Sequence, residues 1–215
     1  MLTLEGLQRL HLQPMDLTVA DGECVAITGG SGAGKSVLLR AIADLDPHAG
    51  RARVDDQACD AMPAPAWRQR VAYVPAESGW WQDIVRPHFL PDTDFAALLP
   101  QVGLRAECAD WPVSRLSTGE RQRLALLRAL RPAVRVLLLD EPTSGLDTRS
   151  VEQVEALLRE QLARGTSIVL VTHSPEQAAR LASRHFHLQD GRLHPASAST
   201  SDAAPSKATP PETAA

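Results

Sequence analysis

The sequence predicts an α/β fold in which helices flank a mostly parallel sheet. Apolar runs without alternation, typical of strands buried on both faces, occur at residues 23–28, 135–139 and 167–171. A helical spacing of apolar residues fills 150–164, and Gly165 then provides a helix-stop signal. A glycine-rich stretch separates the first strand from a second helical segment at 37–43. Strands that alternate with helices in this way favour a parallel sheet.

The rest of the chain is organised around this core. A further strand is predicted at 70–74, and an Asp190-Gly191 turn between apolar residues predicts a hairpin. The region from about 79 to 116 lacks strand runs and holds three tryptophans, so we expect a small helical subdomain inserted in a domain of residues 1–195. Residues 196–215 contain only Ala, Ser, Thr, Pro, Asp, Lys and Glu, which predicts a disordered tail.

Composition excludes several classes of protein. The chain has 215 residues and a formal net charge of -4, which disfavours a protein that coats nucleic acid. The longest apolar run, Phe95–Leu99, is far short of the roughly 18 residues that a membrane-spanning helix needs. The first residues lack the features of a secretory signal, so we expect a cytosolic protein. Three widely spaced cysteines suggest buried thiols rather than a disulfide framework.

The glycine-rich stretch carries the strongest chemical signal. It fits the phosphate-binding pattern G-x-x-x-x-G-K-[ST] with Gly29, Gly30, Ser31, Gly32, Ala33, Gly34, Lys35 and Ser36. Glycines let backbone N–H groups turn towards phosphate oxygens, and the following helix directs its positive end to the same anion. Lys35 is expected to reach the β- and γ-phosphates and Ser36 to ligate Mg²⁺, and Val37 is a further nucleotide-binding candidate. A flexible glycine linker is the alternative, which the flanking strand and helix disfavour.

A carboxylate pair ends the strand at 135–139. In open parallel sheets, ligands bind at the carboxyl ends of the strands. Asp140 is therefore placed to hold Mg²⁺, and Glu141 to polarise an attacking water as a general base. Taken alone, a pair of carboxylates that merely caps a strand is the more common explanation. The pair gains weight from the phosphate-binding pattern in the same chain.

Together with three other motifs, that pattern makes the sequence resemble the ATP-binding cassette (ABC) ATPases. Residues 116–123, Leu-Ser-Thr-Gly-Glu-Arg-Gln-Arg, are similar to the signature motif of that family, LSGGQ. Residues 140–147 are similar to its Walker B motif running into the D-loop, and His173 to its switch histidine. Four motifs in family order span nearly the whole chain apart from the tail. The resemblance implies a P-loop NTPase fold with a RecA-like core, an N-terminal β subdomain and a short helical subdomain.

The resemblance also implies a mechanism. Two cassettes, as a homodimer or a heterodimer, pair head to tail, and each ATP lies between the phosphate loop of one and the signature of the other. Ser117, Gly119 and Glu120 of the signature would then face the nucleotide of the partner, at the start of a helix expected over 121–130. His173 would contact the γ-phosphate, and Asp147 would cross the interface. On its own, His173 would more readily be explained as a structural histidine.

The sequence departs from the family pattern at three places. No glutamine stands where the family has its Q-loop; Ala76 occupies that register, and we hypothesise that Glu77 reaches Mg²⁺ or its water instead. The residues before the phosphate loop include no aromatic to stack on adenine, and Leu10 or His11 lies nearest. Thr118 replaces the first glycine of the signature pair.

The function predicted from these features is that of the ATP-hydrolysing subunit of an ABC transporter. Such a subunit would bind ATP and Mg²⁺, lie on the cytoplasmic face of the inner or plasma membrane, and drive a separate integral membrane permease. Trp80 and Trp81 could line the groove that receives the permease, or could pack a small satellite core. Two alternatives are a soluble ABC-type ATPase not coupled to transport, and a low-turnover regulatory cassette. No nucleic-acid partner is expected.

Overall fold

The computed structural model describes residues 1–196, and residues 197–215 lie outside the description. The predicted disordered tail falls on these last residues, except for Ala196, which ends the last strand instead. Within the described residues, no helix is long and apolar enough to cross a membrane. The three cysteines, Cys24, Cys59 and Cys108, are buried free thiols.

A parallel sheet forms the centre of the molecule, as predicted. Its strand order is β10-β9-β3-β8-β7-β6, and only β10 runs antiparallel to its neighbour. Every residue of β7 and β8 is buried, which explains why both strands are unbroken apolar runs. The bounds are β3 Cys24–Thr28, β6 Val71–Val74, β7 Val136–Asp140, β8 Ser167–Val171, β9 Arg184–Gln189 and β10 Arg192–Ala196.

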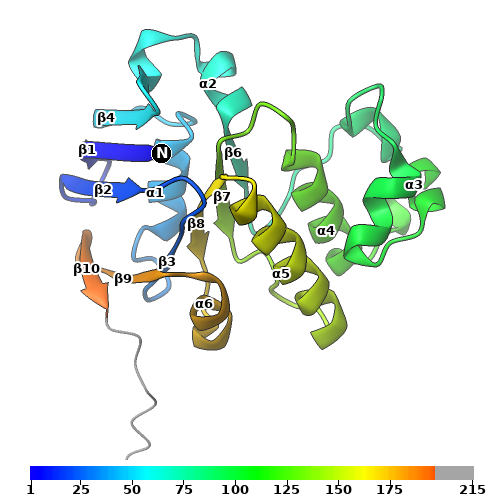
Figure 1. Ribbon diagram of the computed structural model, residues 1–215. Helices are drawn as coiled ribbons and strands as arrows, with labels where there is room; N and C mark the ends of the chain where they lie inside the picture. Colours follow the sequence, from blue (N-terminus) through cyan, green and yellow to red (C-terminus); the bar gives the residue numbers. More distant parts are fainter. Residues whose placement is uncertain (197–215) are drawn as a thin grey trace, which may run out of the picture.

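A second, antiparallel sheet at the amino-terminal end of the chain covers one face of the parallel sheet (Figure 1). Its strand order is β2-β1-β4-β5, with bounds Met15–Val19, Leu2–Gln8, Ala49–Val54 and Gln57–Ala58. Helix α1 (Lys35–Ile42) lies between the two sheets, and its apolar side chains share one core with residues from both. Trp67 of α2 (Ala64–Arg70) is fully buried in that core. This sheet matches the N-terminal β subdomain that the family resemblance implied.

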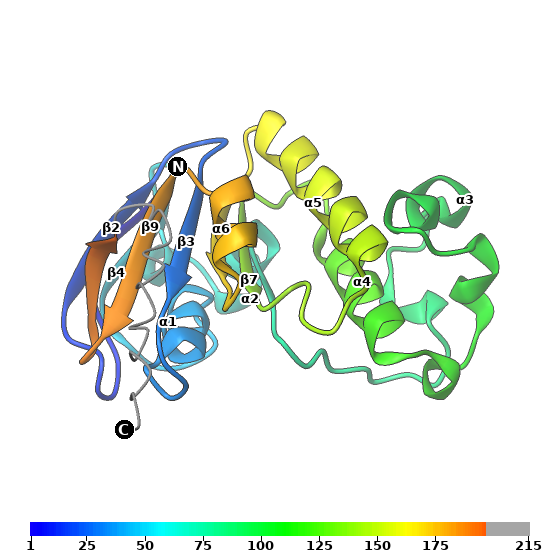
Figure 2. The same ribbon diagram turned by 90° about the horizontal axis from the view of Figure 1, so that it is seen from below.

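The opposite face of the parallel sheet carries the other helices and a second core (Figure 2). These helices are α4 (Thr118–Ala129), α5 (Thr148–Ala163) and α6 (Pro175–Leu181). The predicted inserted subdomain follows β6 and packs on this side. It contains one short helix, α3 (Phe95–Leu98), and 3₁₀ turns at 86–88, 99–102, 106–110 and 113–115.

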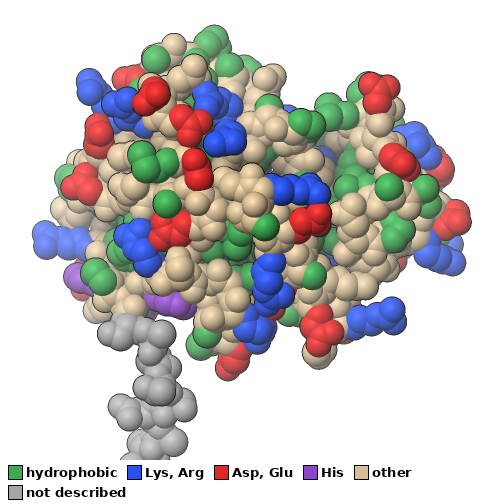
Figure 3. All heavy atoms as spheres, viewed as in Figure 1, with side chains coloured by type: hydrophobic (Ala, Val, Ile, Leu, Met, Phe, Trp, Pro, Cys, Tyr) green, Lys and Arg blue, Asp and Glu red, His purple; other side chains and the backbone are tan. Residues whose placement is uncertain are grey.

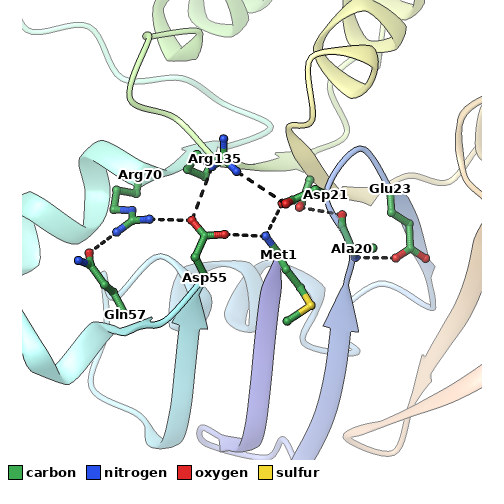
Figure 4. A network of polar contacts seen from close by, with 9 residues as sticks. Met1, Ala20, Asp21, Glu23, Asp55, Gln57, Arg70 and Arg135 are labelled. Carbon is green, nitrogen blue, oxygen red and sulfur yellow. Dashed lines mark hydrogen bonds and ion pairs between the residues drawn. The ribbon is translucent and has the colours of Figure 1, made fainter.

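Charged side chains tie the ends of several strands together. The amino group of Met1 pairs with Asp21 and with Asp55, and Asp55 also pairs with Arg70 and Arg135 (Figure 4). Hydrogen bonds from the amino group, with help from both arginines, keep the pKa of Asp55 below its ordinary value. The network joins both sheets at one edge. Elsewhere on the surface, Figure 3 shows acidic and basic side chains interspersed over the face seen in Figure 1.

A buried carboxylate fixes α6 against α5, and it yields a stability prediction. Glu155 is 2% exposed and accepts bonds of 2.8 and 2.6 Å from Arg180 and one of 3.1 Å from Arg159. Removing the partner of a buried charge lowers the free energy of unfolding strongly. Because Arg180 is half exposed, water can reach the vacated position and replace part of the lost hydrogen bonding to Glu155. We expect Arg180→Ala to lower the free energy of unfolding by about 2 kcal/mol. Arg159→Ala is the matched control, because it removes the i,i+4 pair between Arg159 and the same Glu155. We expect it to lower the free energy of unfolding by about 0.5 kcal/mol. Urea unfolding measures both, and equal effects would contradict this account.

Candidate functional site

The glycine-rich loop leaves the carboxyl end of β3 and leads directly into α1. Gly34, the residue before the helix, has φ of 101°, in the left-handed region. A Cβ at this position would lie 2.6 Å from Nε2 of His11 and 2.7 Å from Cδ2 of Leu12, so only glycine fits. No described side chain caps α1. The first N–H groups of the helix have no partner within it and are therefore available to an anion.

Lys35 lies inside this loop rather than in solvent. Its side chain is buried at the base of the loop, and Nζ donates to the carbonyl oxygens of Gly29 and Gly30, at 2.8 and 3.0 Å. The ammonium group thus closes the loop around the space in front of α1. An ammonium, with three donors and a compact charge, can bond both carbonyls and still meet a phosphate oxygen. The role predicted for Lys35 at the β- and γ-phosphates stays a prediction.

Two predicted metal ligands meet at the carboxyl edge of the sheet. Ser36 Oγ, on the first turn of α1, donates to Oδ2 of Asp140, at the end of β7, over 2.6 Å. Tyr73, on β6, donates its hydroxyl to the same oxygen over 3.2 Å. A hydroxyl and a carboxylate are the kinds of oxygen ligand that Mg²⁺ uses when most of its shell comes from phosphate and water. The described residues contain no cluster of three or more His, Cys, Asp or Glu that could bind a metal.

Glu141 and His173 form a second pair beside this edge. Oε2 of Glu141 accepts a bond of 3.2 Å from the backbone N–H of His173, and Oε1 lies 3.6 Å from His173 Nε2. Oε1 is buried and has no hydrogen-bond partner among residues 1–196. Burial raises the pKa of Glu141, an effect that the His173 N–H partly offsets. Glu141 also has φ of 50°, an uncommon conformation for a non-glycine residue that is often found at functional sites. The buried, unpaired carboxylate oxygen is suited to accept a proton from water.

The signature residues form a separate half-site at the start of α4. Helix α4 begins at Thr118, three residues before the predicted start, because Ser117 and Glu120 form a capping box. Glu120 Oε2 accepts from both the N–H and the hydroxyl of Ser117, at 2.8 Å each. Burial alone would raise the pKa of Glu120, but these hydrogen bonds lower it. Gly119 lies so close to Leu146 that a Cβ would come within 2.9 Å of its Cδ2.

Asp147 caps the amino end of α5. Its carboxylate accepts from the N–H of Ser150 at 3.0 Å and from the Ser150 hydroxyl at 2.7 Å, and these bonds lower the pKa of Asp147. The side chain is exposed at the surface. Its predicted role across a dimer interface stays a prediction.

The helices that follow the two half-sites lie on opposite faces of the parallel sheet. Helix α1 packs in the core shared with the antiparallel sheet, whereas α4 packs in the second core. No hydrogen bond or ion pair among residues 1–196 joins Ser117 or Glu120 to the loop at 29–37. Buried Gln122 of α4 donates to the backbone oxygen of Glu141 over 3.1 Å, which joins the helix after the signature to the end of β7.

Glu77, His11 and Leu10 were predicted to contact the metal or the base, and they differ in where they lie. Glu77 is exposed and makes no hydrogen bond or ion pair with any described residue, so its metal-binding role stays a prediction. His11 lies against the phosphate loop, with Nε2 3.4 Å from the carbonyl oxygen of Ala33, whereas Leu10 is 72% exposed. Either residue remains a candidate for contact with the base.

Two contacts were missed by the sequence reasoning. The Tyr73–Asp140 bond depends on how β6 pairs with β7; the one signal was that Tyr73 is the only tyrosine of the chain. The bond from Gln122 to Glu141 depends on how α4 packs beside the end of β7. The signature stretch contained Gln122, but no pattern indicated its partner.

A groove separates the core from the helical subdomain. Its volume is about 410 Å³, and it runs between β6, the end of α1, α4 and the start of the subdomain. Two of its lining side chains, Trp81 and Leu90, are 66% and 53% exposed. Trp80 instead packs against the second core, with Arg128 stacked 4.6 Å from its ring. The sequence left open whether the tryptophans line the groove or pack in a core. Trp80 packs in the core, and Trp81 lines the groove.

Known proteins resemble the chain in sequence. A family described as ABC transporter matches residues 12–144. An aliphatic sulfonates import ATP-binding protein from Frankia alni is 38% identical over 89% of this chain and 78% of its own length. A lipoprotein-releasing system ATP-binding protein from Bordetella avium is 39% identical over 89% of this chain and 91% of its own length. A second aliphatic sulfonates import ATP-binding protein, from Cupriavidus pinatubonensis, is 38% identical over 88% of this chain. That match spans 64% of the relative's own length.

Solved structures resemble the fold. The dimeric post-hydrolysis structure of the ATP-binding cassette MJ0796, bound to ADP and phosphate, superposes with a TM-score of 0.74. The match covers 91% of this chain and 98% of that structure at 24% identity. The architecture of the two sheets and their helices is therefore that of an ATP-binding cassette.

Proposed function

Since the chain belongs to the ABC transporter family and is an ATPase of that family, we propose that it is the ATP-hydrolysing subunit of a transporter. In this proposal two cassettes pair head to tail, and hydrolysis at their interface drives a separate integral membrane permease. The protein is then cytoplasmic and peripheral to the membrane. Two of its relatives are named for sulfonate import and for lipoprotein release, so the relatives do not agree on a substrate or a direction.

One observation carries the dimer proposal. The phosphate loop leads into α1 and the signature turn leads into α4, and these two helices lie on opposite faces of one sheet. Within one molecule the signature has no nucleotide to contact. In a head-to-tail pair, each signature would meet the phosphate loop of the other molecule, where Ser117 and the Gly119 N–H at a helix start favour phosphate. Asp147, exposed beside Leu146 and Gly119, would lie at the same interface.

The residues at the sheet edge fit a magnesium ion that arrives with ATP. Ser36 and Asp140 would hold it, because their oxygens already converge within 2.6 Å of one another. When bound, Mg²⁺ supplies charge neutralisation for the phosphates. Lys35 and the loop N–H groups of residues 29–37 bind and orient the phosphates themselves.

Glu141 is proposed as the general base. Its Oε1 is buried and unpaired, and can accept the proton of a water aimed at the γ-phosphate. His173 orients this carboxylate through its backbone N–H, and its exposed ring is free to bond the γ-phosphate. The raised pKa of Glu141 makes it a better proton acceptor than an ordinary glutamate once it is deprotonated.

The groove beside the helical subdomain is proposed to bind the permease. A short amphipathic helix on the cytoplasmic side of a membrane protein would place its apolar face against Trp81 and Leu90. An exposed tryptophan at the centre of such a contact is a common energetic anchor. Tyr73 and Ser78 also line this groove, which therefore reaches the edge strand of the parallel sheet.

A groove variant tests this part of the proposal. Trp81→Ala is expected to reduce the amount of the chain recovered with native membranes about tenfold, because it removes the anchor of the contact. The matched control is Ile84→Ala, which truncates a 36% exposed side chain of the same subdomain that does not line the groove. Equal recovery of Trp81→Ala and wild type, with ATPase activity intact in both, would place the docking surface elsewhere.

A further inference from the structure

The chain has no glutamine at the Q-loop position, but another residue, Tyr73, contacts the proposed metal site. Ala76 stands where the family has its glutamine, and Glu77 is exposed without a described partner. Yet the proposed metal ligand Asp140 already has a partner on the neighbouring strand. The hydroxyl of Tyr73 donates to Asp140 Oδ2 over 3.2 Å.

Strand register explains why Tyr73 can reach Asp140. Tyr73 of β6 pairs with Leu138 of β7, and Asp140 is two residues further along β7 on the same face. Side chains two positions apart on neighbouring strands lie within reach of a long aromatic residue.

Tyr73 also lies at the wall of the groove. It lines the groove together with Trp81 and Ser78, and β6 is the edge strand of the parallel sheet. Tyr73 is therefore a residue that both lines the proposed docking groove and bonds the proposed metal ligand Asp140. No other described side chain that lines the groove makes a hydrogen bond to Ser36, Lys35 or Asp140.

We propose that Tyr73 is a positioning residue for Asp140 and that it, rather than Glu77, joins the groove to the magnesium site. This inference rests on the proposed function. The phenol hydroxyl of Tyr73 holds one carboxylate oxygen of Asp140 in place. In many metal sites, residues that hydrogen-bond to the ligands orient them in this way. A shift of the groove wall moves Tyr73 and thereby changes the orientation of Asp140.

The test measures how much Mg²⁺ nucleotide binding requires. A fluorescent ATP analogue is titrated with Mg²⁺ on the full chain carrying Glu141→Gln, which stops turnover. Adding Tyr73→Phe is expected to raise the Mg²⁺ concentration for half-maximal binding about tenfold, while binding in EDTA is unchanged. Phenylalanine keeps the ring, and the EDTA measurement checks that the variant is folded.

A matched control and a rival variant complete the design. Ser78→Ala removes a buried hydroxyl in the same groove that has no hydrogen-bond partner among the described residues. Its Mg²⁺ requirement is expected to stay within twofold of that of its parent. Glu77→Ala is measured in parallel. A tenfold rise for Glu77→Ala with none for Tyr73→Phe overturns the proposal, as does equal Mg²⁺ dependence of Tyr73→Phe and its parent. If the parent itself binds no nucleotide, the proposed function fails instead, so the two failures are distinguishable.

Discussion

Glu141→Gln is expected to lower the rate of ATP hydrolysis by at least about 100-fold while leaving ATP binding intact. General-base catalysis typically contributes 10²–10⁴-fold to a rate, and glutamine keeps the shape of the side chain without a basic oxygen. The bond from the His173 N–H can still form to the amide oxygen, so the fold of the site is preserved. Phosphate release gives the rate, and equilibrium binding of ATP gives the affinity.

The same variant tests the head-to-tail pair. With hydrolysis blocked, Mg²⁺ and ATP are expected to accumulate a dimer that elutes at twice the monomer mass on size exclusion. Glu160→Gln is the control, since Glu160 is half exposed and, within the described part of the chain, forms an ion pair only with Arg164 at the far end of α5. A rate of ATP hydrolysis by Glu141→Gln equal to that of wild type would show that Glu141 is not the general base.

Lys35→Ala is expected to weaken ATP binding by about 100-fold or more. The ammonium makes two hydrogen bonds that close the loop, to Gly29 and Gly30, and would add a contact to the phosphates. Bonds to a charged group contribute about 1.5–3 kcal/mol each, and every 1.4 kcal/mol is tenfold in affinity. The variant therefore loses both the closed loop and the charge.

Lys35→Arg separates these two losses. Arginine keeps the charge but replaces a compact ammonium with a planar group that does not fit two carbonyls and a phosphate at once. We expect it to recover only a small part of the affinity. Isothermal titration calorimetry with ATP measures all three proteins, and an ATP affinity of Lys35→Ala within threefold of wild type would contradict the account.

The parallel sheet was predictable because its strands are buried on both faces. The apolar runs that form β7 and β8 have no competing helical period, and β8 has the predicted bounds, 167–171. The antiparallel sheet was expected only from the family resemblance. Its strands alternate buried and exposed residues over short lengths, as in β2, and no single strand of this kind is a strong signal.

The start of α4 shows what local pattern reasoning missed. The helix was predicted from its apolar residues at 121–130, but it begins at Thr118 because the Ser117–Glu120 capping box satisfies its first N–H groups. The S-x-x-E spacing was visible in the sequence. The extra turn brings Gly119 into the helix and against Leu146, next to the Asp147 cap.

Motifs located the site, whereas pairings between distant elements completed it. Ser36 and Asp140, which two separate motifs contribute, meet because the carboxyl ends of β3 and β7 share one sheet edge. Tyr73 and Gln122 could not be placed in the same way. Each depends on the register or packing of a neighbouring element, which no spacing within one segment encodes.

The claim that this ATPase drives a membrane permease is tested most directly by what binds it in its native host. The tagged Glu141→Gln chain is captured from gently solubilised membranes in the presence of Mg²⁺ and ATP, and its partners are identified. We predict one membrane protein with several spanning helices, in an amount about equal to that of the tagged chain, and its loss on Trp81→Ala. Recovery of the chain from the soluble fraction without a membrane partner would contradict the claim.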